Sequence, residues 1–116
     1  MQVERVKYII WAADMERAKR FYGDLFGARV VRSNEHVTEL EIAGTTLGIH
    51  GGGEGKRTWT GMAFQVEDVI KGADELVAAG GCLVREINDT PEDPAHLAMC
   101  ADPEGNEIML TQQRDG

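Results

Sequence analysis

The three histidines are the side chains best suited to hold a metal ion or to move a proton, and their spacing brings no two of them together. His36, His50 and His96 are separated by intervals that do not match those of paired metal ligands. The two cysteines, Cys82 and Cys100, form no Cys-x-x-Cys motif, and we expect both to be reduced thiols. These residues by themselves therefore predict neither a metal site of standard form nor a disulfide framework.

The glycine-rich run in the middle of the chain does not match a phosphate-binding loop. Such a loop needs Gly-x-x-x-x-Gly-Lys followed by Ser or Thr. Aligning Gly55 and Lys56 to that pattern places His50 at the first glycine and Arg57 at the hydroxyl position. The run also precedes a predicted strand and does not open a helix. We therefore predict a flexible linker over 51–57.

Composition and charge restrict the possible functions. The chain has 116 residues, of which 12 are basic and 20 acidic, so its formal net charge at pH 7 is −8. Nucleic acids and anionic membranes attract basic surfaces, so neither is an expected partner. The longest apolar run, 8–13, is too short to cross a bilayer, and the first residues lack the apolar core of a secretory signal. We expect one cytoplasmic domain, 1–116.

Hydrophobic periodicity predicts that the chain contains the same unit twice. In each half a strand precedes a helix, and three strands follow. The first helix has an Asp14 N-cap and ends at Gly27, and the second has an Asp68 N-cap and ends at Gly80-Gly81. The equal intervals indicate an internal duplication. Strands are expected over 6–11, 28–32, 36–42, 45–50, 58–66, 82–87, 95–101 and 106–112.

Two motifs connect this pattern to a known family. The helix reads Asp-x-x-Arg-Ala-x-x-Phe-Tyr at 14–22, and the last turn reads Asp-Pro-Glu-Gly-Asn at 102–106. Together with the duplication, they make the chain resemble the vicinal oxygen chelate superfamily, which includes glyoxalase I, extradiol dioxygenases and the bleomycin-resistance proteins. The resemblance implies an α+β fold in which two tandem β-α-β-β-β modules, 1–50 and 58–113, form an eight-stranded open-barrel cleft. It also implies a homodimer, either side by side or domain-swapped.

The resemblance further implies four metal-ligand positions on the first and last strands of the two modules. These positions correspond to Lys7, Gly48, Gly61 and Met109. Lys7 would place a positive charge where the cation belongs, glycine has no side-chain donor, and a thioether suits a hard ion poorly. We therefore expect no metal and no cofactor.

The alternation of side chains along the strands predicts what lines the cleft. Apolar walls and a few polar groups share the face opposite the helices, and the small residues Gly48, Gly61 and Ala63 leave space between them. Such a mixture is typical of small-molecule sites, and acidic groups near aromatic walls favour a flat or cationic ligand. The predicted cleft residues are Lys7, Trp11, Glu39, Glu41, His50, Trp59, Gln65 and Met109, with Ile9 beside them.

These residues support two main hypotheses. The first is a metal-free protein that binds a small organic molecule without catalysis, with sequestration of a drug or metabolite as its most specific form. The alternative is a lyase, isomerase or dioxygenase that uses Lys7, or His50 with Glu39 or Glu41, for acid–base chemistry or as a weak metal site. A third interpretation is a regulatory domain whose cleft is vestigial.

Each predicted cleft residue also has a purely structural interpretation. Lys7 can pair with Glu39 or Glu41 across strands, a contact worth less than about 1 kcal/mol. Trp11 and Trp59 are suited to packing or to dimer contacts. Sequence alone leaves these interpretations open.

Overall fold

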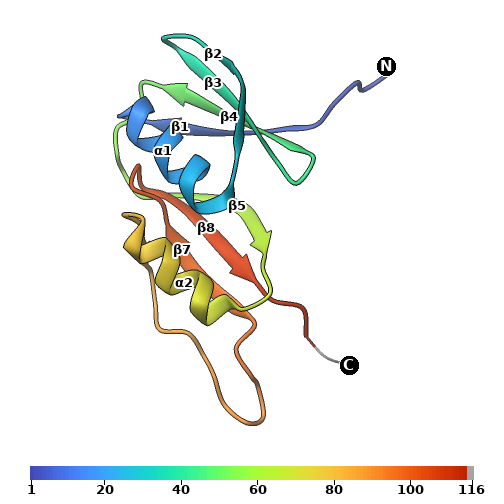
Figure 1. Ribbon diagram of the computed structural model, residues 1–116, viewed down its shortest axis with the longest axis vertical. Helices are drawn as coiled ribbons and strands as arrows, with labels where there is room; N and C mark the ends of the chain where they lie inside the picture. Colours follow the sequence, from blue (N-terminus) through green and yellow to red (C-terminus); the bar gives the residue numbers. More distant parts are fainter. Residues whose placement is uncertain (115–116) are drawn as a thin grey trace.

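Each half of the chain forms a four-stranded sheet with one helix packed on it (Figure 1). The computed structural model describes residues 1–114. The first half contains β1 (Lys7–Ala12), α1 (Met15–Phe26), β2 (Arg29–Ser33), β3 (Val37–Ile42) and β4 (Thr45–Gly51). The second half contains β5 (Thr58–Gln65), α2 (Val69–Ala78), β6 (Cys82–Leu83), β7 (Leu97–Ala101) and β8 (Asn106–Thr111).

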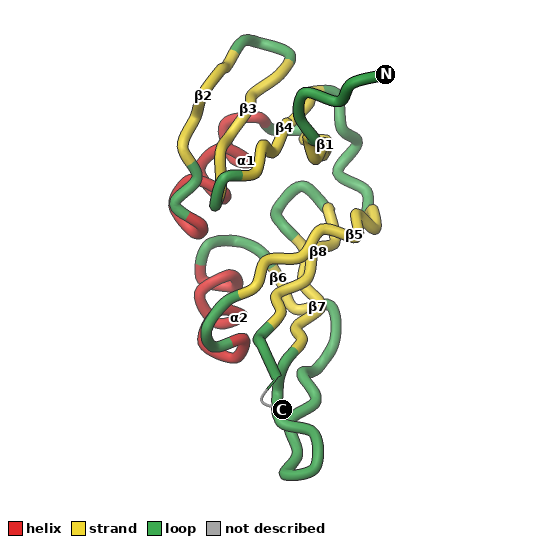
Figure 2. The backbone as a smooth tube through the Cα atoms, turned by 90° about the vertical axis from the view of Figure 1, so that its right-hand side faces the viewer, coloured by secondary structure: helices red, strands yellow, loops and turns green. Residues whose placement is uncertain are grey.

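The two sheets have equivalent strand orders, β1-β4-β3-β2 and β5-β8-β7-β6. In each module the first strand pairs in parallel with the last, and the other neighbours are antiparallel. The prediction of two tandem β-α-β-β-β modules is confirmed. The eight strands form two separate sheets of four, and the modules follow one another along the long axis of the molecule (Figures 1 and 2).

The helices begin where the sequence predicts. The carboxylates of Asp14 and Asp68 accept hydrogen bonds from backbone N–H groups in the first turn, which confirms both N-caps. Gly27 ends α1 in the left-handed conformation, with φ 67°, which glycine adopts without strain. The second helix ends at Ala78, slightly before the predicted Gly80. Neither helix in the described part of the chain is long and apolar enough to span a membrane.

The strand predicted over 82–87 is much shorter in the structure. Only Cys82–Leu83 pairs with β7, and the chain then leaves the sheet as a long connection that extends from one end of the molecule (Figure 2). Within this connection Thr90 and Asp93 exchange backbone hydrogen bonds of 3.1 and 3.2 Å. These local turn bonds, and nearby prolines that lack an N–H group, compete with continued pairing to β7.

The turn between β7 and β8 is hydrogen-bonded to the N-terminal end of α1. Glu104 accepts hydrogen bonds from the backbone N–H groups of Ala13 and Asp14, each at 2.9 Å, and from Arg17 Nε at 2.5 Å. Burial raises the pKa of the Glu104 carboxyl, but these donors together outweigh that effect and leave its pKa below the ordinary value. The carboxylate therefore joins the second module to the first.

A second polar cluster makes the same connection deeper in the interior. Tyr22 donates from its hydroxyl to Asp102 Oδ2 at 2.6 Å, and Asn106 Nδ2 donates to the same oxygen at 3.0 Å. Asn106 Nδ2 also donates to the carbonyl oxygen of Trp11 at 2.9 Å. Burial, together with the charge of Asp102, raises the pKa of Tyr22 well above its ordinary value. The helix motif and the last turn are thus in direct contact.

We predict that Glu104→Gln lowers the free energy of unfolding by roughly 1–3 kcal/mol, because it removes the charge that accepts three hydrogen bonds in a buried position. Urea denaturation measures the change. Glu16→Gln is the matched control, since Glu16 is an exposed residue of α1 whose ion pair with Lys19 is a surface contact. The control is expected to lose less than about 0.5 kcal/mol.

The effect of Glu104→Gln also depends on pH. Because the folded-state pKa of Glu104 is lowered, its contribution is fully present above the unfolded-state pKa of about 4.3 and is lost as the pH falls through the folded-state value. The difference between the wild type and Glu104→Gln should therefore shrink in acid. A difference that is constant across this range would contradict the proposed role of the charge.

Candidate functional site

The face of the first sheet opposite α1 carries a carboxylate held between two cations. Glu39 Oε2 lies 3.0 Å from Lys7 Nζ, and Glu39 Oε1 lies 2.9 Å from Arg32 Nε. The Glu39 side chain is only 8% exposed. Its Oε2 accepts no hydrogen bond of good geometry from the described residues, so the contact with Lys7 is mainly ionic. A buried charge of this kind depends on its partners.

Lys7 keeps Glu39 ionised. Close contact with Lys7 lowers the pKa of the Glu39 carboxyl, burial opposes this effect, and the charge of Arg32 adds to it. Glu41 lies apart from this cluster, since it is exposed and pairs with Arg29 at 3.3 Å. Of the two partners that the sequence leaves open for Lys7, the structure therefore selects Glu39.

Aromatic side chains lie further along the same face. The rings of Trp11 and His50 are 5.0 Å apart and tilted by 49°, and Trp11 is 53% exposed. Ile9 stands between this pair and the charged cluster. A Cβ atom on Gly48 would lie 2.7 Å from Ile9 Cδ1, so the space predicted at Gly48 is filled by Ile9.

The corresponding face of the second sheet carries the remaining predicted residues. Trp59 is 54% exposed. Met109 is half-buried and pairs with Ala63 and Met99 on the neighbouring strands. Gln65 is exposed and lines a cavity of about 610 Å³ between β5, β4 and the end of α1.

The eight predicted residues thus fall into two groups. Lys7 and Glu39 are in contact, Trp11 and His50 are in contact, and Glu41 lies near the end of β3 in the same sheet. The other three, Trp59, Gln65 and Met109, lie on the second sheet. Each group occupies an uncovered sheet face.

The four positions that correspond to metal ligands do not suit a divalent ion. The Lys7 ammonium is engaged by Glu39. Gly61 has φ 73°, a conformation that side-chain-bearing residues rarely adopt, at an irregularity in the pairing of β5 with β8. Gly48 and Met109 add no hard donor. Among residues 1–114, no group of three or more His, Cys, Asp or Glu side chains is arranged to hold a metal ion.

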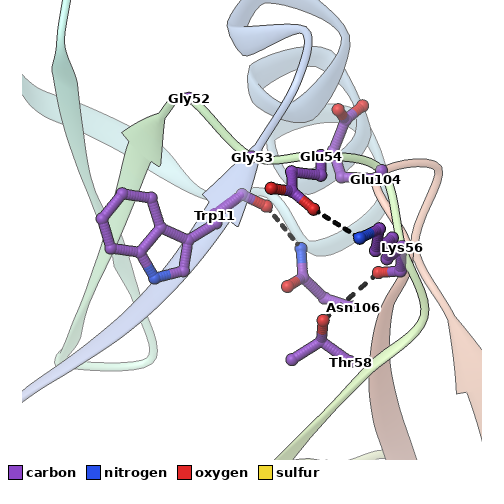
Figure 3. Close-up of a pocket in the computed structure, with 9 residues that line it drawn as sticks. Trp11, Gly52, Gly53, Glu54, Lys56, Thr58, Glu104 and Asn106 are labelled. Atoms are coloured by element: carbon purple, nitrogen blue, oxygen red, sulfur yellow. Dashed lines mark hydrogen bonds and ion pairs between the residues drawn. The ribbon is translucent and has the colours of Figure 1, made fainter.

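A cavity of about 260 Å³ lies where the two modules meet beside the linker (Figure 3). The linker packs against both modules, since Gly53 N donates to the Ala12 carbonyl at 3.0 Å and Thr58 N donates to the Gly105 carbonyl at 2.8 Å. The cavity is lined by Trp11, Gly52, Gly53, Glu54, Gly55, Lys56, Thr58, Glu104 and Asn106.

Of these lining residues, only Trp11 belongs to the cleft predicted from the sequence. Asn106 and Glu104 belong to the turn motif at 102–106, which the sequence identified as a family feature and not as part of a site. Only the contact between this turn and the end of β1 brings them beside Trp11.

Comparison with known proteins agrees with this architecture. The family model of the Glyoxalase/Bleomycin resistance protein/Dioxygenase superfamily matches residues 5–110. A probable lactoylglutathione lyase of Vibrio parahaemolyticus is 28% identical over 116 aligned positions, which cover 87% of this chain and 84% of the relative.

Solved structures show the same fold. A crystal structure of the fosfomycin resistance protein FosX from Listeria monocytogenes has a TM-score of 0.80 at 18% identity, covering 100% of this chain and 95% of that one. Another structure of this FosX, complexed with Mn(II) and sulfate, has a TM-score of 0.78 at 19% identity and covers 97% and 93% of the two chains.

We predict that Lys7→Met raises the pKa of the Glu39 carboxyl, because the main contact that stabilises the charged form is lost while the apolar stem is kept. Titration of the side-chain carboxyl signals by ¹³C NMR measures this shift. Arg29→Met, which removes the partner of the exposed Glu41, is the matched control and should leave the Glu39 titration unchanged. An unchanged Glu39 pKa in Lys7→Met would show that the ion pair does not form in solution.

Proposed function

Because the chain belongs to the Glyoxalase/Bleomycin resistance protein/Dioxygenase superfamily, we propose that it binds a small organic molecule without a divalent metal. The ligand lies in a cleft formed by the uncovered faces of the two sheets. Binding without turnover is the main function, and sequestration of a drug or metabolite is its most specific form.

The observation that carries this proposal is the ion pair between Lys7 and Glu39. Lys7 stands at the first position that corresponds to a metal ligand, and its ammonium lies 3.0 Å from a carboxylate that is almost fully buried. A divalent ion at this place would be repelled by Lys7 and would have to displace it from Glu39. The Lys7 ammonium therefore already compensates the negative charge of Glu39.

The remaining cleft residues suit an organic ligand. Trp11 and Trp59 are each about half exposed, one on either sheet, and offer flat apolar surfaces. His50 and Gln65 add hydrogen-bonding groups, and Glu41 adds an exposed carboxylate. This combination favours a flat molecule that is neutral or cationic.

A homodimer completes the proposed cleft. Ile9, Trp11 and Trp59 are exposed on the two sheet faces that no helix covers. Large apolar side chains exposed on a sheet face favour association with a second surface. We propose that a second copy of the chain covers these faces, so that each cleft lies at the dimer interface.

Catalysis is the second candidate function. The Vibrio parahaemolyticus relative, 28% identical, is named a probable lyase, which favours an enzyme. In this chain Glu39 is held ionised beside Lys7, and such a pair of groups is able to accept and return a proton. Turnover of a lyase, isomerase or dioxygenase substrate that is lost in Glu39→Gln would favour this function over binding alone.

We predict that the purified protein takes up no stoichiometric Ni²⁺, Zn²⁺, Mn²⁺ or Fe²⁺, as measured by isothermal titration calorimetry and elemental analysis. At least one compound in a panel of aromatic metabolites and antibiotics should raise its melting temperature, because a ligand at 100 times its Kd adds about 2.7 kcal/mol of stability. Tight uptake of one ion per chain would overturn the metal-free proposal. A panel without any effect would favour a vestigial cleft.

We predict that the protein is a dimer by sedimentation velocity at micromolar concentration, and that Trp59→Asp shifts it toward the monomer. The substitution places a charge on the apolar surface that the partner is proposed to cover. Val77→Asp is the control, since Val77 is similarly exposed but lies on α2. A monomeric wild type, or equal dissociation of both variants, would contradict the proposed interface.

A further inference from the structure

We infer that the free edge of β5 binds an extended peptide whose central residue is apolar and whose N-terminal flank is basic. The site is the cavity of about 610 Å³ between β5, β4 and the end of α1, which we call the β5 cavity. Gln65 borders both this cavity and the proposed cleft, but the cavity lies on the helix side of the first sheet. The inference therefore goes beyond the proposed function.

The first argument is that one edge of β5 is unpaired. In the described part of the chain β5 is the outermost strand of its sheet and pairs only with β8 (Figure 1). Val66 directs its N–H group toward β8, since it donates to the Thr111 carbonyl at 2.7 Å. Backbone groups alternate in direction along a strand, so the N–H and C=O groups of Ala63 and Gln65 point away from β8. This edge is open to one more strand.

The second argument is that the edge of β5, and not one of its faces, borders the β5 cavity. The consecutive residues 61–66 all line it. Because successive side chains point to opposite faces of a sheet, such a run borders one cavity only where the backbone edge faces it. The opposite wall comes from the first module, with Tyr8 and Leu47 from its sheet and Phe26 from the end of α1. A strand added to β5 therefore lies between β5 and this wall.

The third argument is that this edge carries no charge. Exposed edge strands commonly carry charged side chains, which oppose the addition of another strand. The edge strand of the first sheet, β2, carries Arg29 and Arg32. Among residues 1–114, those that line the β5 cavity include no charged side chain. The pairing of β5 is also regular from Ala63 to Gln65, beyond its irregular part, so this segment suits an added strand.

The register of the added strand predicts an apolar central residue. We place the peptide antiparallel to β5, because antiparallel pairs are slightly more stable than parallel ones. Two of its residues then exchange backbone hydrogen bonds with Ala63 and Gln65, and the residue between them lies opposite Phe64. Residues opposite each other point to the same face, and the Phe64 ring stacks on Phe26 at 4.1 Å there. A leucine side chain at the central position therefore enters the apolar part of the cavity.

The charge beyond the end of β5 predicts a basic flank. A second cavity, of about 320 Å³, shares Val66 with the β5 cavity. Three carboxylates line it, from Glu67, Asp68 and Glu75, and Lys71 supplies the single cation among the described lining residues. An antiparallel peptide extends its N-terminal residues in this direction, and its residue opposite Val66 points to the same face as the central residue. A lysine or arginine at that position meets net negative charge.

The peptide acetyl-Lys-Thr-Leu-Thr-amide has this pattern, and N-methylation at single positions gives matched control peptides. In the proposed register the two threonines lie opposite Gln65 and Ala63, so their N–H groups point at β5, whereas the leucine N–H group points away. Titrated into the ¹⁵N-labelled chain, the peptide should shift the backbone N–H signals of Ala63 and Gln65. N-methylation of either threonine should weaken binding roughly two- to tenfold, and N-methylation of the leucine should leave it nearly unchanged.

Two substitutions test the edge and the charge separately. Ala63→Pro removes an N–H group that faces the free edge and keeps the pairing with β8, so it should weaken binding roughly two- to tenfold. Glu67→Gln should reduce the preference for this peptide over the same peptide with glutamate in place of lysine. Glu16→Gln, an exposed change on α1, should leave both measurements unchanged. If Ala63→Pro does not fold, the N-methylated peptides still decide the question.

Several outcomes would overturn the inference. Equal affinity for the parent peptide and the peptides N-methylated at threonine would show that the strand edge is not used. Shifts confined to the signals of Trp11 and His50 would place the peptide in the proposed cleft. Protection of the Ala63 and Gln65 amides from hydrogen exchange that appears without peptide and rises with protein concentration would show that a second copy covers this edge. Absence of any shift at the solubility limit of the peptide would exclude the site.

Discussion

The position of the two modules relative to each other depends on one buried carboxylate. Glu104 leaves the last turn of the second module and accepts two backbone N–H groups and one guanidinium at the start of α1. The first N–H groups of a helix have no partner within the helix, so an acceptor from another module stabilises both the helix end and the interface. Tyr22 and Asp102 add a second connection close by. Without these contacts the two sheets would be joined mainly by apolar packing, such as the 4.1 Å stack of Phe26 on Phe64.

The same connection creates the smaller cavity. Asn106 belongs to the turn that carries Glu104, and its amide binds the backbone of Trp11 at the end of β1. This bond ties the backbone at the end of β1 to the second module, and the glycine-rich linker packs against Ala12 on the neighbouring side. A Cβ atom on Gly53 would lie 2.8 Å from Ala12 N, so glycine is required for this close approach.

Electrostatics set the character of the uncovered face of the first sheet, which carries a lysine beside a buried glutamate. The ion pair with Lys7 keeps the charge of Glu39 compensated in a poorly solvated place. The Lys7 ammonium gives this face a positive charge and hydrogen-bond donors.

What the sequence determined by itself is local or repetitive. The caps Asp14, Asp68 and Gly27 follow from side-chain chemistry within one helical turn, and the duplicated spacing predicted two equivalent modules. The identity of Lys7 was enough to predict a position unsuited to a metal. Only the tertiary structure decided which of Glu39 and Glu41 pairs with Lys7, how far the strand after Cys82 continues, and that Asn106 reaches Trp11. These outcomes depend on contacts between segments that are distant in the chain. Residue type and spacing do not predict which of several chemically equivalent side chains will lie close enough to form the contact.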